Sequence, residues 1–221
     1  IDPATIAAAS DVLAGAAFDE NERVTRPAIR ALGQIGTHEA TRLLGSLAQR
    51  FADHRSEAAV QALAHIGTAQ ALDLLAAASD PAEGHPHVDA AEALAGLGDA
   101  RGLNLLHAIT ASEPCDSDTR VRAAVALSAW GDQHAADLLA SFAGDPAVGS
   151  DDRWTAATRL MDLPDPRAAG QLSSAAGDEG LYPHRRLTAI EMLSKLGDPR
   201  DVPLLAVMVR DARSLQRRWG W

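Results

Sequence analysis

The sequence is poor in cysteine and in aromatic residues, and it lacks a long apolar run. Its one cysteine, Cys115, excludes a disulfide within the chain and a thiolate metal cluster. Aromatic residues make up only 4% of the 221 residues, whereas Ala and Leu, which suit closely packed helices, dominate. No apolar run approaches the ~20 residues that a membrane span needs, and we expect no signal peptide. Period-two alternation of β-branched residues is also missing, so we predict no sheet.

The charge is acidic and unevenly distributed. The formal net charge is −10. Residues 1–149 contain 20 Asp and Glu against 9 Arg, whereas residues 150–221 contain 10 against 11 Arg and Lys. Because an acidic surface repels phosphate groups, nucleic-acid binding is disfavoured, and a basic protein partner is accommodated more easily.

The composition also bears on origin and location. Lys195 is the only lysine among 20 basic residues, a bias typical of a GC-rich bacterial genome. A single cysteine fits a reducing cytoplasm. The chain begins with Ile1 instead of Met, so we expect a part of a larger bacterial cytoplasmic protein. The oligomeric state is not predicted.

A short phrase recurs six times along the chain. It consists of a residue paired with Leu, two variable residues, a further residue that is usually apolar, Gly and a capping residue. The copies are 31–37, 62–68, 93–99, 126–132, 159–165 and 192–198, so they recur at intervals of 31 or 33 residues. Gly can end a helix in the left-handed conformation, and the Thr or Asp that follows can cap the next helix. The phrase therefore predicts two antiparallel helices joined by a short turn.

The second helix of each predicted pair carries its own pattern. The pairs are Leu43-Leu44, Leu74-Leu75, Leu105-Leu106, Leu138-Leu139 and Leu204-Leu205, with Gln171-Leu172 as a degraded copy. An apolar residue usually follows three positions after the second Leu, on the same helical face. We therefore predict a repeated two-helix unit whose apolar faces stack on their neighbours.

The resemblance to a known family is specific at this point. The segment 196–205, Leu-Gly-Asp-Pro-Arg-Asp-Val-Pro-Leu-Leu, resembles HEAT-like repeats, including the short bacterial version of phycobilisome-lyase-type proteins. The resemblance covers roughly residues 19–210. It implies an all-α, right-handed α-solenoid of antiparallel helix pairs, with first helices on the convex side and second helices on the concave side. The fifth copy has Pro164 in place of Gly, so we expect an irregular junction at 164–172.

The boundaries follow from the phrase. We predict a single repeat domain over 1–221, with an N-terminal helix or cap at 1–18 and a C-terminal tail at 213–221. The six repeats between them are 19–53, 54–83, 84–116, 117–149, 150–180 and 181–212. The tail, which contains Trp219 and Trp221, is interpreted either as a cap over the last repeat or as a partner-binding segment.

Clusters that could carry chemistry are few. His38-Glu39 has the residue types of diiron hydroxylases in this superfamily, but it lies at the start of a second helix, where that family would not place it. His85, His87 and Asp89 could hold a metal, but they lie in a loop and lack a second half-site. We therefore predict no catalytic residue, no metal and no cofactor.

Binding is the leading interpretation. Solenoids of this type offer an extended groove to a protein or peptide. We predict a non-enzymatic scaffold that binds a protein or peptide partner through exposed positions of the second helices. The candidates are Arg42, Ser46, Asp73, Asn104, His107, Asp137, Ser141 and Ser174.

Two alternatives from another class stay open. A bilin-lyase-like protein would hold an open-chain tetrapyrrole on the concave face, but no chromophore contact is identifiable. A DNA-glycosylase-like protein would use Trp and a carboxylate in a basic groove, and the basic groove is missing here. Trp130 precedes a repeat Gly and Trp154 matches Val121 of the previous unit, so we expect both indoles to be packed in the core.

Overall fold

The computed structural model describes residues 2–50, 53–83, 86–196 and 206. Within these ranges the chain forms α-helices and one 3-10 turn, and it contains no strand. None of the helices in these ranges combines the length and apolar character that crossing a membrane would require. The predicted all-α repeat architecture is confirmed. The predicted last second helix and the tail with Trp219 and Trp221 lie outside the described residues.

The helices follow the predicted repeats. After α1 (Pro3–Ala16), the first helices of the pairs are α2 (Glu22–Ile35), α4 (His54–Ile66), α6 (Val88–Gly96), α8 (Ser117–Ala129), α10 (Ser150–Leu160) and α12 (Pro183–Leu196). The second helices are α3 (His38–Arg50), α5 (Ala69–Ala78), α7 (Arg101–Ala111), α9 (Ala135–Gly144) and α11 (Ala168–Gly177). The short turn η1 (Pro81–Glu83) follows α5.

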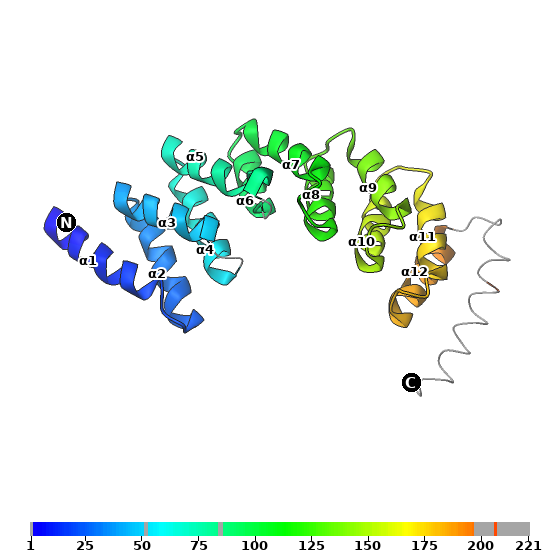
Figure 1. Cartoon of the computed structure of the whole chain (residues 1–221), viewed down its shortest axis with the longest axis horizontal. Coiled ribbons are helices and arrows are strands. Elements are labelled where there is room, and N and C mark those ends of the chain that lie inside the picture. Colours follow the sequence, from blue (N-terminus) through cyan, green and yellow to red (C-terminus); the bar gives the residue numbers. More distant parts are fainter. Residues whose placement is uncertain (1, 51–52, 84–85, 197–205, 207–221) are drawn as a thin grey trace. The chain divides into compact units, whose positions relative to one another are not determined.

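The chain divides into two compact units, unit 1 (residues 1–115) and unit 2 (residues 116–221). In unit 1 the helices succeed one another in chain order (Figure 1). First helix α2 packs on α4, and α4 packs on α6, while second helix α3 packs on α5, and α5 on α7. Unit 1 thus consists of a first-helix layer and a second-helix layer. In unit 2, α10 packs on α8, α9 and α11, and α11 packs on α12.

Leucines at equivalent positions build the core of both units. The second Leu of each pair has no exposed surface in the helices that are described: Leu44, Leu75, Leu106, Leu139 and Leu172. The Leu of the recurring phrase is equally buried, from Leu32 in α2 to Leu193 in α12. Each such side chain contributes about 1.5–3 kcal/mol when it leaves water. The apolar pattern therefore sets which face of each helix points inward.

Left-handed glycines end the first helices as the phrase predicts. Gly36, Gly67, Gly98 and Gly131 have φ between 61° and 78°, a region that residues with a Cβ avoid. The hydroxyl of Thr37 then accepts the N–H of Ala40 at 3.2 Å, which caps α3. In the fifth copy α10 already ends at Leu160, and α11 begins only at Ala168. The longer turn there is consistent with Pro164 replacing the glycine; a weaker junction stays a prediction.

The first helix of the chain covers the first repeat. α1 packs on α2 and α3, and its Leu13 lies against the core of unit 1. Most of α1 is solvent-exposed, and Val12 keeps 74% of its surface in water. The N-terminal helix predicted from sequence is present, and it covers one end of the stack with a narrow apolar contact.

The prediction that Trp130 lies in the core is wrong. Its surface is 46% exposed, and Leu97 at the equivalent position of α6 has the same exposure. Both residues follow the last residue of their first helix, so they stand in the turn to the second helix and not on the buried face of the first. Trp154 in α10, in contrast, packs against the core of unit 2.

Two helical glycines should respond oppositely to alanine. A Cβ at Gly102 would lie 2.4 Å from the backbone nitrogen of Ala95, whereas a Cβ at Gly170 would meet nothing within 4 Å. We expect Gly102→Ala to destabilise the protein by about 1–3 kcal/mol through overpacking. Gly170→Ala should stabilise it by about 0.5–1 kcal/mol, because α11 loses a flexible residue. Urea unfolding measures both, and equal effects would contradict this packing of α7 on α6.

Candidate functional site

The predicted binding residues of unit 1 lie at one repeated position of the second helices. Arg42 in α3, Asp73 in α5 and Asn104 in α7 each follow their capping residue by five positions, and all three are exposed. Because α3 packs on α5 and α5 on α7, these side chains form a row along the second-helix layer. We call Arg42, Asp73 and Asn104 the second-helix row.

The remaining candidates differ in exposure. Ser46 is half-buried and donates its hydroxyl to the carbonyl of Leu43 at 2.8 Å. His107 is half-buried in α7. In unit 2, Asp137 and Ser141 are exposed on α9, and Ser174 is exposed on α11. The structure therefore brings together the row of unit 1, while the unit 2 candidates form their own set.

Two of the candidate carboxylates are already engaged by arginines of the next repeat. Arg101 donates to Asp73 at 2.7 Å and to its own capping residue Asp99 at 2.7 Å. In unit 2, Arg167 repeats this arrangement with Asp137 at 2.8 Å and Asp165 at 2.6 Å. We call these two groups the arginine brackets. They link successive second helices at the solvent-exposed edge.

Sequence reasoning missed the arginine brackets, although a signal was present. In each bracket the arginine stands two residues after a capping Asp, and the partner carboxylate stands five residues after the previous capping residue. Residues Asp198 and Arg200 repeat the first half of this pattern outside the described ranges. Gln70 occupies the position of the bracket arginine in an earlier repeat, but its Oε1 lies 2.9 Å from Nδ1 of His38, which stands one residue after its capping residue instead of five.

The arginine brackets also shift the pKa values of the residues that form them. The side-chain hydrogen bond from Arg101 holds the pKa of Asp99 below its ordinary value, and Arg167 does the same to the pKa of Asp165. The two carboxylates around each guanidinium in turn raise the pKa of that arginine. The two arginines and the outer carboxylates of Asp73 and Asp137 are exposed, so those pairs add little stability, whereas the carboxylates of Asp99 and Asp165 are largely covered.

A further ion pair lies in a small hollow of unit 2. Arg153 donates to the carboxylate of Asp178 and, at 2.7 Å, to the carbonyl of Val148. Burial is the largest single influence on Asp178 and would raise its pKa, but the hydrogen bonds from Arg153 and from the backbone N–H of Gly180, together with the charge of Arg153, outweigh it, and the net shift is downward. The hollow has a volume of about 200 Å³ and also contacts Trp154 and Ser174. The pair fastens the loop after α11 to the start of α10.

The sequence clusters considered for metal binding do not assemble. Among the residues with described positions, no group of three His, Cys, Asp or Glu side chains could hold a metal ion. His87 Nδ1 lies 3.8 Å from Asp89 Oδ2, while His85 is outside those positions. Cys115 is buried and forms no disulfide with a described residue. The described residues thus offer surfaces and ion pairs, and the structure assigns no chemistry to these clusters.

The comparisons with known proteins agree with the fold. Residues 10–85 match the family model for HEAT repeats, which confirms the resemblance seen in the sequence. No curated protein matches the chain. One similar solved structure is the complex of CpcE and CpcF of phycocyanin lyase from Nostoc sp. PCC7120. That match has 21% identity and a TM-score of 0.41, and it covers 92% of this chain and 82% of that one.

A second solved structure is human deoxyhypusine hydroxylase in complex with glycerol. It shares 15% identity with a TM-score of 0.42, and the match covers 97% of this chain and 98% of that one. At these values neither likeness indicates an activity or a partner for this chain. The functional argument therefore rests on the residues of the chain itself.

The arginine brackets predict a pH-dependent contribution to stability. Because the pKa values of Asp99 and Asp165 are depressed in the folded state, their stabilisation is present above the unfolded carboxyl pKa of about 3.9. It is lost as the pH falls through the folded values. We expect Arg101→Gln/Arg167→Gln to lower the melting temperature at pH 7, with a difference from wild type that shrinks below pH 4. A difference independent of pH would contradict the role given to these pairs.

Proposed function

We propose that this chain is a non-enzymatic scaffold that binds a protein or peptide partner across its second-helix layer. The observation that carries the proposal is the second-helix row, in which the same exposed position of three successive helices bears Arg42, Asp73 and Asn104. A row of this kind repeats at the spacing of the helices and suits an extended partner. Its side chains combine a cation, an anion and an amide, which recognise a polar peptide surface.

The arginine brackets support this proposal by fixing the row. Arg101 holds Asp73 of the neighbouring helix, so this member of the row is pre-organised before a partner arrives. Pre-organisation lowers the entropic cost of binding, because fewer side chains are immobilised at association. A partner carboxylate would compete with Asp73 for Arg101, and a partner cation would join Asp73 beside it.

The charge of unit 1 suggests the chemistry of the partner. Unit 1 contains 15 Asp and Glu against 7 Arg. A basic surface would be steered toward it and would bind more weakly as salt rises. We propose a basic protein or peptide as the partner of the second-helix layer, and the bacterial cytoplasm as the compartment.

Affinity capture with matched variants tests the proposal. The test variant is Arg42→Ala/Asn104→Ala, which removes two members of the second-helix row and leaves both arginine brackets in place. The control is Arg23→Ala/Thr188→Ala, which removes an arginine and a second polar side chain from the exposed surfaces of first helices α2 and α12. We expect a partner that the wild-type chain captures at low salt to be lost from the test variant and retained by the control.

The capture also has outcomes that would overturn the scaffold. Equal recovery of the same protein by the test and control variants would remove the second-helix layer as the binding surface. A pigment, metal or nucleic acid that co-purifies in stoichiometric amount would contradict a non-enzymatic scaffold. The test variant should weaken binding of the partner about tenfold or more, since each truncated hot-spot residue costs on the order of 1–2 kcal/mol.

A further inference from the structure

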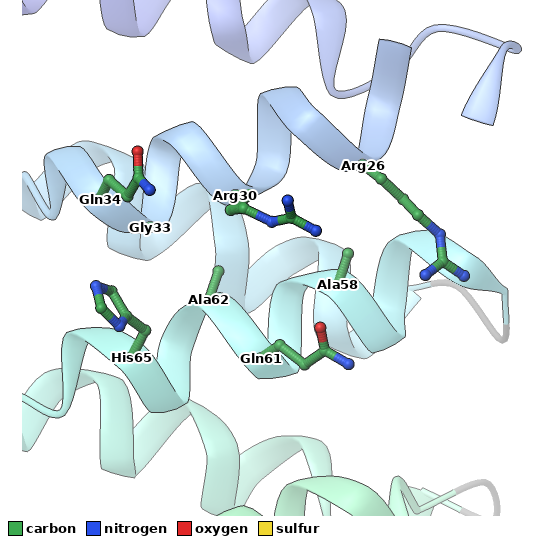
Figure 2. Close-up of a pocket in the computed structure, with 8 residues that line it drawn as sticks. All are labelled: Arg26, Arg30, Gly33, Gln34, Ala58, Gln61, Ala62 and His65. Atoms are coloured by element: carbon green, nitrogen blue, oxygen red, sulfur yellow. The ribbon is translucent and has the colours of Figure 1, made fainter. Parts of the chain in front are cut away.

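The opposite layer of unit 1 contains a groove of a different character. It lies between first helices α2 and α4 and has a volume of about 260 Å³. Its lining residues are Arg26, Arg30, Gly33, Gln34, Ala58, Gln61, Ala62 and His65. Figure 2 shows Arg30 extending from α2 into the space between the two helices, where Ala58 and Ala62 point from α4.

Small residues create the floor of this groove. A Cβ at Gly33 would lie 2.8 Å from the Cβ of Ala62, so α2 and α4 touch there almost backbone to backbone. With only methyl groups at Ala58 and Ala62, the space above the contact stays open. A peptide backbone can therefore approach the two helices closely.

Polar side chains form the rim of the groove, and most of them make no hydrogen bond or ion pair to a described residue. Arg26 is held at one end by Glu22 at 2.6 Å and by Glu57 at 3.2 Å. The side chains of Arg30, Gln34, Gln61 and His65 make no hydrogen bond or ion pair to any residue whose position is described. Arg30 and Gln34 lie one helical turn apart on α2, and Gln61 and His65 lie one turn apart on α4. All four residues line the groove.

The groove is also an exception to the charge around it. Unit 1 carries 15 acidic residues against 7 arginines, but no carboxylate lines the groove. Its charged lining groups are Arg26, whose charge Glu22 and Glu57 balance, and Arg30, whose charge no described residue balances. An unpaired guanidinium offers two parallel N–H donors, the arrangement that binds a carboxylate in bidentate fashion.

We propose that the groove between α2 and α4 binds an acidic peptide segment of a partner protein, with a Glu or Asp carboxylate on Arg30. The amides of Gln34 and Gln61 then pair with the flanking peptide groups, which have both donors and acceptors. The volume lies below the range that drug-sized ligands occupy, so it suits one side chain with its neighbouring backbone. This surface is separate from the second-helix row and prefers ligands of the opposite charge.

Peptide titrations monitored by NMR test this proposal on the full chain. The chain carries the isotope label, and the probes are three unlabelled peptides that share one Gly/Ser/Ala host and carry Glu-Leu-Glu, Gln-Leu-Gln or Lys-Leu-Lys at the centre. We expect the Glu peptide to shift the backbone amide signals of Gly33, Gln34, Gln61 and Ala62. The Gln and Lys peptides should leave these signals in place at the same concentrations.

Matched variants identify the guanidinium. Arg30→Gln should weaken the Glu peptide about tenfold, as expected for losing hydrogen bonds to a charged group. Arg23→Gln removes an exposed arginine of the same helix that does not line the groove, and it should bind like the wild type. Arg30→Glu should abolish binding of the Glu peptide and admit the Lys peptide.

Three results would overturn the proposal. One is a shift pattern that is the same for the Glu and Gln peptides, and another is an equal loss of binding in Arg23→Gln and Arg30→Gln. The third is a dimer of the wild-type chain, seen by light scattering, that Arg30→Gln dissociates, because a second copy would then occupy the groove. The variants of the second-helix layer keep this groove intact, so failure of either proposal leaves the other standing.

Discussion

Each helix pair of this chain depends on its neighbour to bury its apolar face. Leucines such as Leu63 in α4 and Leu75 in α5 have no exposed surface, and the contacts that cover them come partly from adjacent pairs. One two-helix unit alone would leave such faces in water. Stacking therefore sets the spacing of the helices, and close contacts such as Gly33 with Ala62 set how near they come.

This spacing places exposed surface positions of successive helices at equivalent sites. On the second-helix layer it aligns Arg42, Asp73 and Asn104, and on the first-helix layer it places Arg30 and Gln61 at equivalent positions of α2 and α4. The two layers then differ in the ion pairs that their exposed arginines make. Arginine brackets occupy the edge of the second helices, whereas the groove between α2 and α4 keeps a guanidinium without a described partner. The two proposals therefore assign ligands of opposite charge to the two layers.

The sequence predicted the fold well because the governing signals are local. The Gly and the Thr or Asp that follows it mark the helix ends, and paired leucines mark the buried face of each second helix. The prediction for Trp130 is wrong because an apolar residue before the repeat Gly need not be buried. The helix has already ended at that position. The brackets and the groove were missed because they depend on side chains of neighbouring repeats, such as Arg101 with Asp73, whose meeting follows from register.

The claim that partners bind the second-helix layer is tested most directly by photo-crosslinking in cells. A benzophenone amino acid would be placed at Arg42 or Asn104 on second helices of unit 1, and at Arg122 or Thr188 on first helices, all of them exposed positions. The account predicts that one protein crosslinks to the second-helix positions and leaves the first-helix positions unmodified. Adducts with that protein only at Arg122 or Thr188 would contradict it.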